Sequence, residues 1–183
     1  NVMGTLTFNA TPSVAVNPIN LSPNTTYPLL VCGGIAPVAV PTLVSIRGFS
    51  GSILAWAGNT LQLTVGTASP IIEALKWTTS GTATWDVNNI VNTVWKDSAG
   101  SPVTTYYAEP PVAGSVDSVV FDDTYIAGNP IVTLNSTVSP GSVIFNDSTY
   151  SYTVSGSGSI AGAGSLTKSG TNLVTLTTAS SYS

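Results

Sequence analysis

The stretch from residue 155 to residue 178 has the sequence SGSGSIAGAGSLTKSGTNLVTLTT, and its pattern is the main basis for the predicted architecture of the chain. Its apolar residues are isolated: Ile160 and Leu166 come first, and Leu173, Val174 and Leu176 follow. Glycines separate these residues, and most other positions hold serine or the β-branched threonine, which favours a pleated strand. Short strands joined by glycine turns are typical of a β-solenoid, in which each rung buries its apolar face on its neighbour.

The rest of the chain also predicts strands. Leu61, Leu63 and Val65 alternate with polar residues, and proline or glycine interrupts most apolar runs. The expected fold class is all-β, with antiparallel β-sandwich or jelly-roll-like modules followed by solenoid-like strands. Three parts are expected: an N-terminal β module over residues 1–70, a tryptophan-rich β module over 71–154, and a glycine- and threonine-rich segment over 155–183 that is donated to a neighbouring subunit.

Several segments resemble a known family. Residues 156–183, GSGSIAGAGSLTKSGTNLVTLTTASSYS, are similar to the autotransporter-associated β-strand repeat of secreted bacterial surface proteins. The phrases TWDVNNIVNTVW, SVVFDDT and TVSPGSVIFND are similar to the module that often leads into such repeats, and the region from GTLTFNAT to GNTLQLTV is similar to the segment that often closes them. The resemblance implies an extracellular or cell-surface protein with a structural or adhesive role and no catalytic chemistry.

The composition excludes some classes of function. Only 7% of the residues are charged, against about 25% in an ordinary domain. Four basic residues cannot build the basic face that nucleic-acid binding requires. The sequence contains no run of 18 apolar residues, so it predicts no membrane-spanning helix. Low charge also weakens the usual protection of strand edges against association, so copies of the same chain are the expected partners.

Catalytic chemistry finds little support. The chain has no histidine, so Ser-His-Asp triads and imidazole zinc sites are excluded. Paired carboxylates remain as an alternative, and we interpret the acidic side chains as turn and strand-end residues. The candidates are Asp86, Asp97, Glu109, Asp117, Asp122 and Asp123. We expect no enzyme activity and no cofactor.

Two binding sites are candidates. Asp117, Asp122 and Asp123, joined by Asp147, form the densest oxygen cluster, which suits calcium, although the EF-hand spacing is missing. The aromatic residues offer a sugar platform, with Trp56, Trp85 and Trp95 as its members, and surface glycans as its ligands. The other interpretation of the tryptophans is that Trp77, Trp85 and Trp95 form the core of the second module.

The two ends of the chain suggest how copies meet. Val2, Leu6 and Phe8 alternate in a predicted strand, and Leu173, Val174 and Leu176 lie in the last strands. Placing TASSYS before NVMGTLTF continues the pattern of the resembled repeat. The expected function is therefore a structural subunit of an extracellular or cell-surface filament that polymerises head-to-tail by β-strand addition. The alternative is a carbohydrate-binding adhesin module of a large secreted surface protein.

Overall fold

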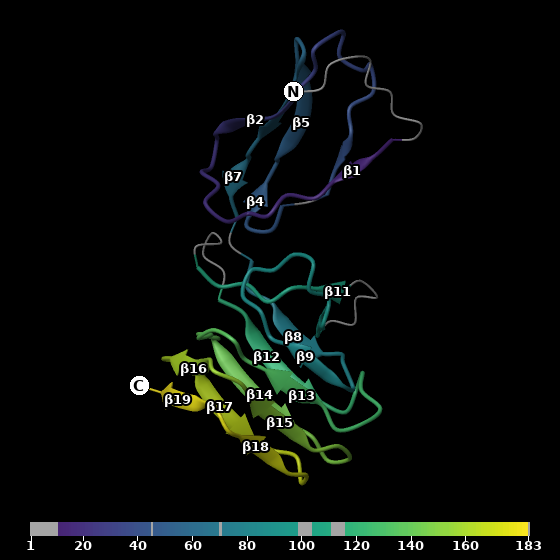
Figure 1. Cartoon of the computed structure of the whole chain (residues 1–183). Helices are drawn as coiled ribbons and strands as arrows, with labels where there is room; N and C mark the ends of the chain where they lie inside the picture. The colour runs from purple at the N-terminus through teal and green to yellow at the C-terminus, as the bar shows by residue number, and fades with distance from the viewer. Residues whose placement is uncertain (1–10, 45, 70, 99–103, 111–115, 183) are drawn as a thin grey trace. The chain divides into compact units, whose positions relative to one another are not determined.

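The computed structural model describes residues 11–44, 46–69, 71–98, 104–110 and 116–182. The described residues form β-strands and no helix, so the predicted all-β class is confirmed (Figure 1). The chain divides into two compact units, Asn1–Ile71 with Pro111–Ala113, and Ile72–Pro110 with Gly114–Ser183. The strand predicted over Val2 to Phe8 lies outside the described residues.

The described residues of the first unit form three small sheets. Strands β2 (Thr26–Val31), β6 (Thr60–Thr64) and β5 (Ile53–Ala57) pair antiparallel in that order. Strands β4 (Phe49–Ser50) and β7 (Thr67–Ala68) are also antiparallel, and β1 (Ser13–Val14) and β3 (Thr42–Leu43) are parallel. The predicted alternation is confirmed in β6 and the residue after it, because Leu61, Leu63 and Val65 are buried.

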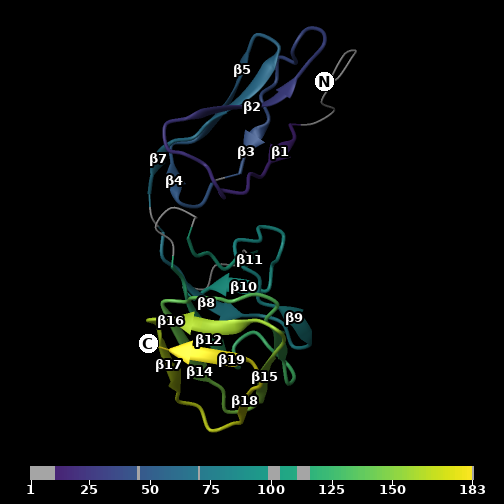
Figure 2. The ribbon, with the colours of Figure 1, turned by 60° about the vertical axis from the view of Figure 1, so that its left-hand side comes forward.

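The second unit is built from parallel ladders. One sheet contains β8 (Ala74–Trp77), β12 (Ser118–Asp122), β14 (Ser142–Asn146) and β17 (Ser165–Lys168), all parallel. A second contains β9 (Thr82–Thr84), β13 (Ile131–Thr133), β15 (Tyr152–Ser155) and β18 (Val174–Leu176), also parallel. In a third, β16 (Ser159–Gly162) pairs in parallel with β19 (Ala179–Tyr182), and both views show these two strands side by side (Figure 2).

The chain therefore returns to the same three sheets in successive passes, and we call each pass a rung. β14, β15 and β16 form one rung, and β17, β18 and β19 form the next. Parallel pairing joins β8 to β12 and β12 to β14. Among the described residues of 71–154, the predicted antiparallel pairing is confined to β10 (Trp95–Asp97) and β11 (Thr104–Thr105) beside β8. The strands of residues 155–183 extend the ladders that β12 to β15 begin and belong to the same compact unit.

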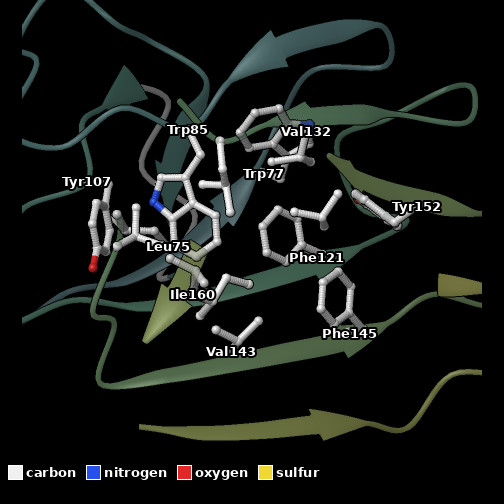
Figure 3. Close-up of a cluster of buried hydrophobic side chains, with 14 of the residues drawn as sticks. Leu75, Trp77, Trp85, Tyr107, Phe121, Val132, Val143, Phe145, Tyr152 and Ile160 are labelled. Carbon is white, nitrogen blue, oxygen red and sulfur yellow. The ribbon is translucent and has the colours of Figure 1, made fainter. Parts of the chain in front are cut away.

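Alternation along each strand builds the core of the second unit. Val119 and Phe121 of β12 pair with Val143 and Phe145 of β14, and all four are buried. Figure 3 shows Val143 and Phe145 pointing to the same side of their strand, toward Phe121. Because the ladders are in register, each inward side chain rests on the equivalent side chain of the rung before it.

An aromatic cluster fills the core next to β8. Trp77, Trp85 and Trp95 are 0%, 0% and 1% exposed, which confirms that they are core residues. The rings of Trp77 and Trp95 lie 5.0 Å apart at 82°, and those of Trp85 and Trp95 lie 5.5 Å apart at 74°. Such edge-to-face pairs add stability beyond the area they bury. Figure 3 shows Trp85 between Tyr107 and Phe121.

The substitution Trp85→Ala should lower the free energy of unfolding by about 3–5 kcal/mol, because it empties a large part of this core. Chemical denaturation of the full chain measures the loss. As a control, Trp56→Ala in the other unit should leave the transition of the tryptophan cluster in place. An unchanged transition in Trp85→Ala would contradict the core assignment.

Candidate functional site

Asp117 lies apart from the other acidic residues proposed for calcium. Asp117 precedes β12, whereas Asp122 and Asp123 lie at its other end. Asp117 is fully buried and accepts the backbone N–H groups of Glu73 at 2.9 Å and Ala108 at 2.8 Å. Within the described residues, no group of three acidic, cysteine or histidine side chains is arranged to hold a metal ion.

Asp122 and Asp123 each have local partners. The Asp122 carboxylate is 2.6 Å from Lys76 Nζ. The Asp123 carboxylate accepts the backbone N–H groups of Ser148, Thr149 and Tyr150 at 2.8, 2.9 and 3.2 Å, and so ties the end of β12 to the turn after β14. Desolvation acts to raise the pKa of Asp123, but the backbone donors outweigh it and lower the pKa below the usual value. Its contribution to stability is therefore present above the pKa of an unfolded aspartate, about 3.9, and is lost as the pH falls through the lower folded pKa.

The residues of the predicted sugar platform do not share a surface. Trp85 and Trp95 are buried in the second unit, so their rings cannot stack on a sugar. Trp56 is in the first unit, is partly buried, and donates its Nε1–H to the carbonyl of Ala39 at 3.1 Å. The platform of Trp56, Trp85 and Trp95 is therefore wrong, because two of its members are core residues.

The two ends of the large parallel sheet differ. Beyond β8, strands β10 (Trp95–Asp97) and β11 (Thr104–Thr105) add antiparallel and cover its edge. Nearby, Asn88 Nδ2 donates to the backbone carbonyl of Glu109 at 2.9 Å, and the backbone N–H of Glu109 donates to Asn88 Oδ1 at 3.0 Å. This end of the unit is capped.

At the other end, β17, β18 and β19 each pair with the preceding rung on one side. Among the described residues, no strand pairs with their second sides, and we call this the open end. Figures 1 and 2 show the yellow C-terminal strands at the margin of the second unit. Leu166 of β17 is 39% exposed, although Leu75, Val119 and Val143 at the equivalent positions of earlier strands are 0% exposed.

A groove of about 380 Å³ lies at the open end. Three of its residues, Leu173, Val174 and Leu176, are the C-terminal residues predicted to contact a neighbouring subunit, and the structure brings them together. Leu173 is 65% exposed. The other lining residues are Phe145, Leu166, Lys168 and Asn172. We call this set the open-end groove. The remaining predicted contacts, Val2, Leu6 and Phe8, lie outside the described residues.

Lys168 occupies an unusual position. The equivalent residues of β8, β12 and β14 are Trp77, Phe121 and Phe145, so a lysine ends a column of inward aromatic side chains. Its Nζ is 3.3 Å from Oδ1 of Asp147, and it donates a hydrogen bond to the carbonyl of Gly170 at 2.5 Å. An inward-pointing charge on an edge strand restricts which strands can add to it.

Lys168 is the ion-pair partner of the buried Asp147 carboxylate. This carboxylate is fully buried, and neither oxygen accepts a hydrogen bond from any residue that the structure describes. The ammonium of Lys168 balances its charge. Sequence analysis missed Lys168, although aligning SVVF, SVIF and SLTK as equivalent strands would have placed it in the aromatic column.

Comparison of the chain with models of protein families, with curated proteins and with solved structures gives no match. Separately, none of the described segments is a helix long and apolar enough to cross a membrane.

Removal of divalent cations should leave the fold intact, since the carboxylates of Asp117, Asp122 and Asp123 already have backbone or lysine partners. Circular dichroism and the melting temperature should be the same with and without a strong chelator. A melting temperature that fell with chelator and recovered with calcium would contradict this assignment.

The substitution Lys168→Met should lower the free energy of unfolding by about 2 kcal/mol, because it leaves the buried Asp147 carboxylate without a partner. Adding Asp147→Asn should restore part of the loss. Lys76→Met is the matched control: its partner Asp122 also accepts the backbone N–H of Thr124 at 2.9 Å, so the carboxylate keeps a partner and the loss should be smaller, about 1 kcal/mol. Equal losses in the two lysine variants, measured by urea denaturation, would show that Asp147 does not depend on Lys168.

Proposed function

We propose that this protein is a structural subunit of an extracellular or cell-surface filament, without enzymatic activity, and that copies associate head-to-tail by β-strand addition at the open end. In this proposal the second unit is a β-solenoid whose last rung is completed by a strand of another copy. The observation that carries it is the exposed interior of that last rung, where Leu166 and Leu173 face the open-end groove. A solenoid rung needs a neighbour on each side to bury its apolar face.

The capped end gives the assembly its direction. Because β10 and β11 cover the edge of β8, the outermost described strand at the capped end is the two-residue β11 and not a strand of the parallel ladder. In this proposal the strand that completes the groove therefore comes from another part of the neighbouring copy. A contact between two different surfaces is heterologous and can repeat without closing, which produces a filament.

The first unit suits the role of donor. Residues 1–72 contain one charged side chain, Arg47, and Arg47 is 8% exposed. A chain segment that lacks charges has little to oppose its addition to a strand edge. The N-terminal residues Val2, Leu6 and Phe8 supply the alternating apolar side chains that such a strand needs. The low charge of the whole chain also supports a role outside the cell, where neutral hydroxyl and amide surfaces form the contacts between copies.

Self-association of the full chain tests the proposal. Sedimentation velocity over a range of concentrations, with electron microscopy of the same samples, should show species larger than a monomer. Leu173→Asp should weaken association at least tenfold by placing a charge in the open-end groove. Val91→Asp is the matched control, since Val91 is 80% exposed in the same unit and does not line the groove.

Deletion of residues 1–10 should also abolish the larger species while the tryptophan fluorescence of the second unit is retained. A chain that stays monomeric at all concentrations would overturn the proposed function. Equal association by Leu173→Asp and the unsubstituted chain would show that copies meet elsewhere.

A further inference from the structure

The geometry points to one segment as the occupant of the open-end groove: we infer that Thr5–Phe8 of a second copy adds to β17, parallel and in register, with Leu6 on Leu166 and Phe8 on Lys168. This inference rests on the proposed head-to-tail association and specifies its donor strand and its register.

The strands of the large sheet share a sequence pattern. β12 begins with SVVF, β14 with SVIF, and β17 consists of SLTK, so a small hydroxyl residue is followed by an inward aliphatic side chain and, two positions later, by an aromatic ring or Lys168. Residues 5–8 have the sequence TLTF, which repeats the pattern with a hydroxyl residue, an aliphatic residue and a phenylalanine at the same positions. Placed after β17, Leu6 would continue the aliphatic column and Phe8 would resume the aromatic one.

The match extends one residue to each side. Residues 141–146 are GSVIFN, residues 164–169 are GSLTKS, and residues 4–9 are GTLTFN. The glycine has a physical reason: a Cβ at Gly164 would collide with the carbonyl oxygen of Pro140 in the preceding rung, and a Cβ at Gly141 would lie 3.3 Å from Ser118 Oγ. β14 and β17 therefore each follow a residue without a side chain, whereas β12 follows Asp117, and Gly4 stands at the same place before TLTF.

The groove fits the side chains that this register directs into it. If Leu6 and Phe8 point inward, Thr5 and Thr7 point outward, because neighbouring residues of a strand face opposite sides. Leu6 then covers the exposed Leu166, and both inward side chains face Leu173, Val174 and Leu176 across the groove. The ring of Phe8 comes to lie on the Lys168 ammonium, which favours an aromatic face through a cation–π contact.

Lys168 also explains why the register is specific. A donor that placed an aliphatic side chain on Lys168 would bury the ammonium beside Asp147 without a compensating contact. A shift by one residue would turn Leu6 and Phe8 to solvent and place threonines in the groove. The in-register arrangement of TLTF avoids both costs.

Disulfide trapping between two variants of the full chain tests the register. Both variants carry Cys32→Ser, which removes the buried native thiol. One then carries Thr5→Cys or Thr7→Cys, and the other carries Ser165→Cys or Thr167→Cys. Paired residues of neighbouring strands lie about 4.8 Å apart, within the Cα separation that a disulfide spans. Residues two positions out of register lie about 8 Å apart, which is too far.

Two pairs are in the inferred register: Thr5→Cys with Ser165→Cys, and Thr7→Cys with Thr167→Cys. Two pairs are shifted by two residues: Thr5→Cys with Thr167→Cys, and Thr7→Cys with Ser165→Cys. After mixing and mild oxidation, the in-register pairs should give at least tenfold more disulfide-linked heterodimer than the shifted pairs. All four sites face the same side of the sheet in the inferred register, so they are matched controls for one another. Non-reducing gel electrophoresis and mass spectrometry of the linked peptides measure the yields.

The other outcomes separate this inference from the proposed function. If the variants associate in sedimentation but the shifted pairs link best, or none links, the inferred donor and register are wrong while head-to-tail association stands. A further variant carries Thr5→Cys and Ser165→Cys in one chain; if it links only within itself and the mixed variants do not link, Thr5–Phe8 occupies its own groove and the second copy is excluded. If the unsubstituted chain does not associate at all, the proposed function fails and the inference fails with it.

Discussion

In-register parallel pairing between successive rungs is the constraint on which the second unit depends. It places Val119 on Leu75, Val143 on Val119, and Leu166 on Val143, so that one column of aliphatic side chains runs through four strands. Each rung supplies half of a buried contact and receives the other half from its neighbour. The strands are only three to five residues long, too short to be stable alone, and the ladder makes them stable together.

Polar contacts between rungs fix the turns as firmly as the apolar columns fix the strands. Asp123 accepts three backbone N–H groups from the turn that follows β14, and the hydroxyl of Tyr152 donates to the carbonyl of Asp122 at 2.7 Å. Burial, together with the charges of Asp122, Asp123 and Asp147, raises the pKa of Tyr152 and keeps this hydroxyl neutral. These contacts lie near the end of β12, where the chain leaves one sheet for the next, and they help to hold the ladders in one register.

Part of this architecture can be predicted from the sequence. The alternation around Leu63 and the glycine-rich repeat after residue 155 indicate strands directly, because their periods are local. The parallel ladder between β8 and β12 is not predictable in this way, since Ala74 and Ser118 are separated by the residues of β9, β10 and β11. The tryptophans illustrate a related difficulty: composition cannot distinguish a core from a sugar platform, and only the ladder places Trp85 inside.

The residues of the open-end groove were likewise predictable only where the signal is local. Leu173, Val174 and Leu176 could be singled out because they are apolar residues at the end of a repeat. Lys168 could not, since a lysine among serines and threonines is typical of a solvent-facing strand, and Asp147 could be singled out only as a calcium candidate. The inward position of Lys168 becomes visible only when SLTK is aligned with the two strands that precede it in the sheet. The sequence thus carries the information, but in the relation between distant segments and not in any one of them.

The difference between the capped and the open end has a consequence for how cooperatively the second unit unfolds. A stack of rungs behaves as a one-dimensional array, in which a terminal rung with one neighbour opens at a lower free energy than an internal rung with two. The aromatic cluster of Trp77, Trp85 and Trp95 anchors the array at β8, whereas within the described residues β17 to β19 pair on one side only. Local opening is therefore expected to be graded along the stack, from β17–β19 toward β8. A strand bound at the open end would turn that last rung into an internal rung with the cooperativity of its neighbours.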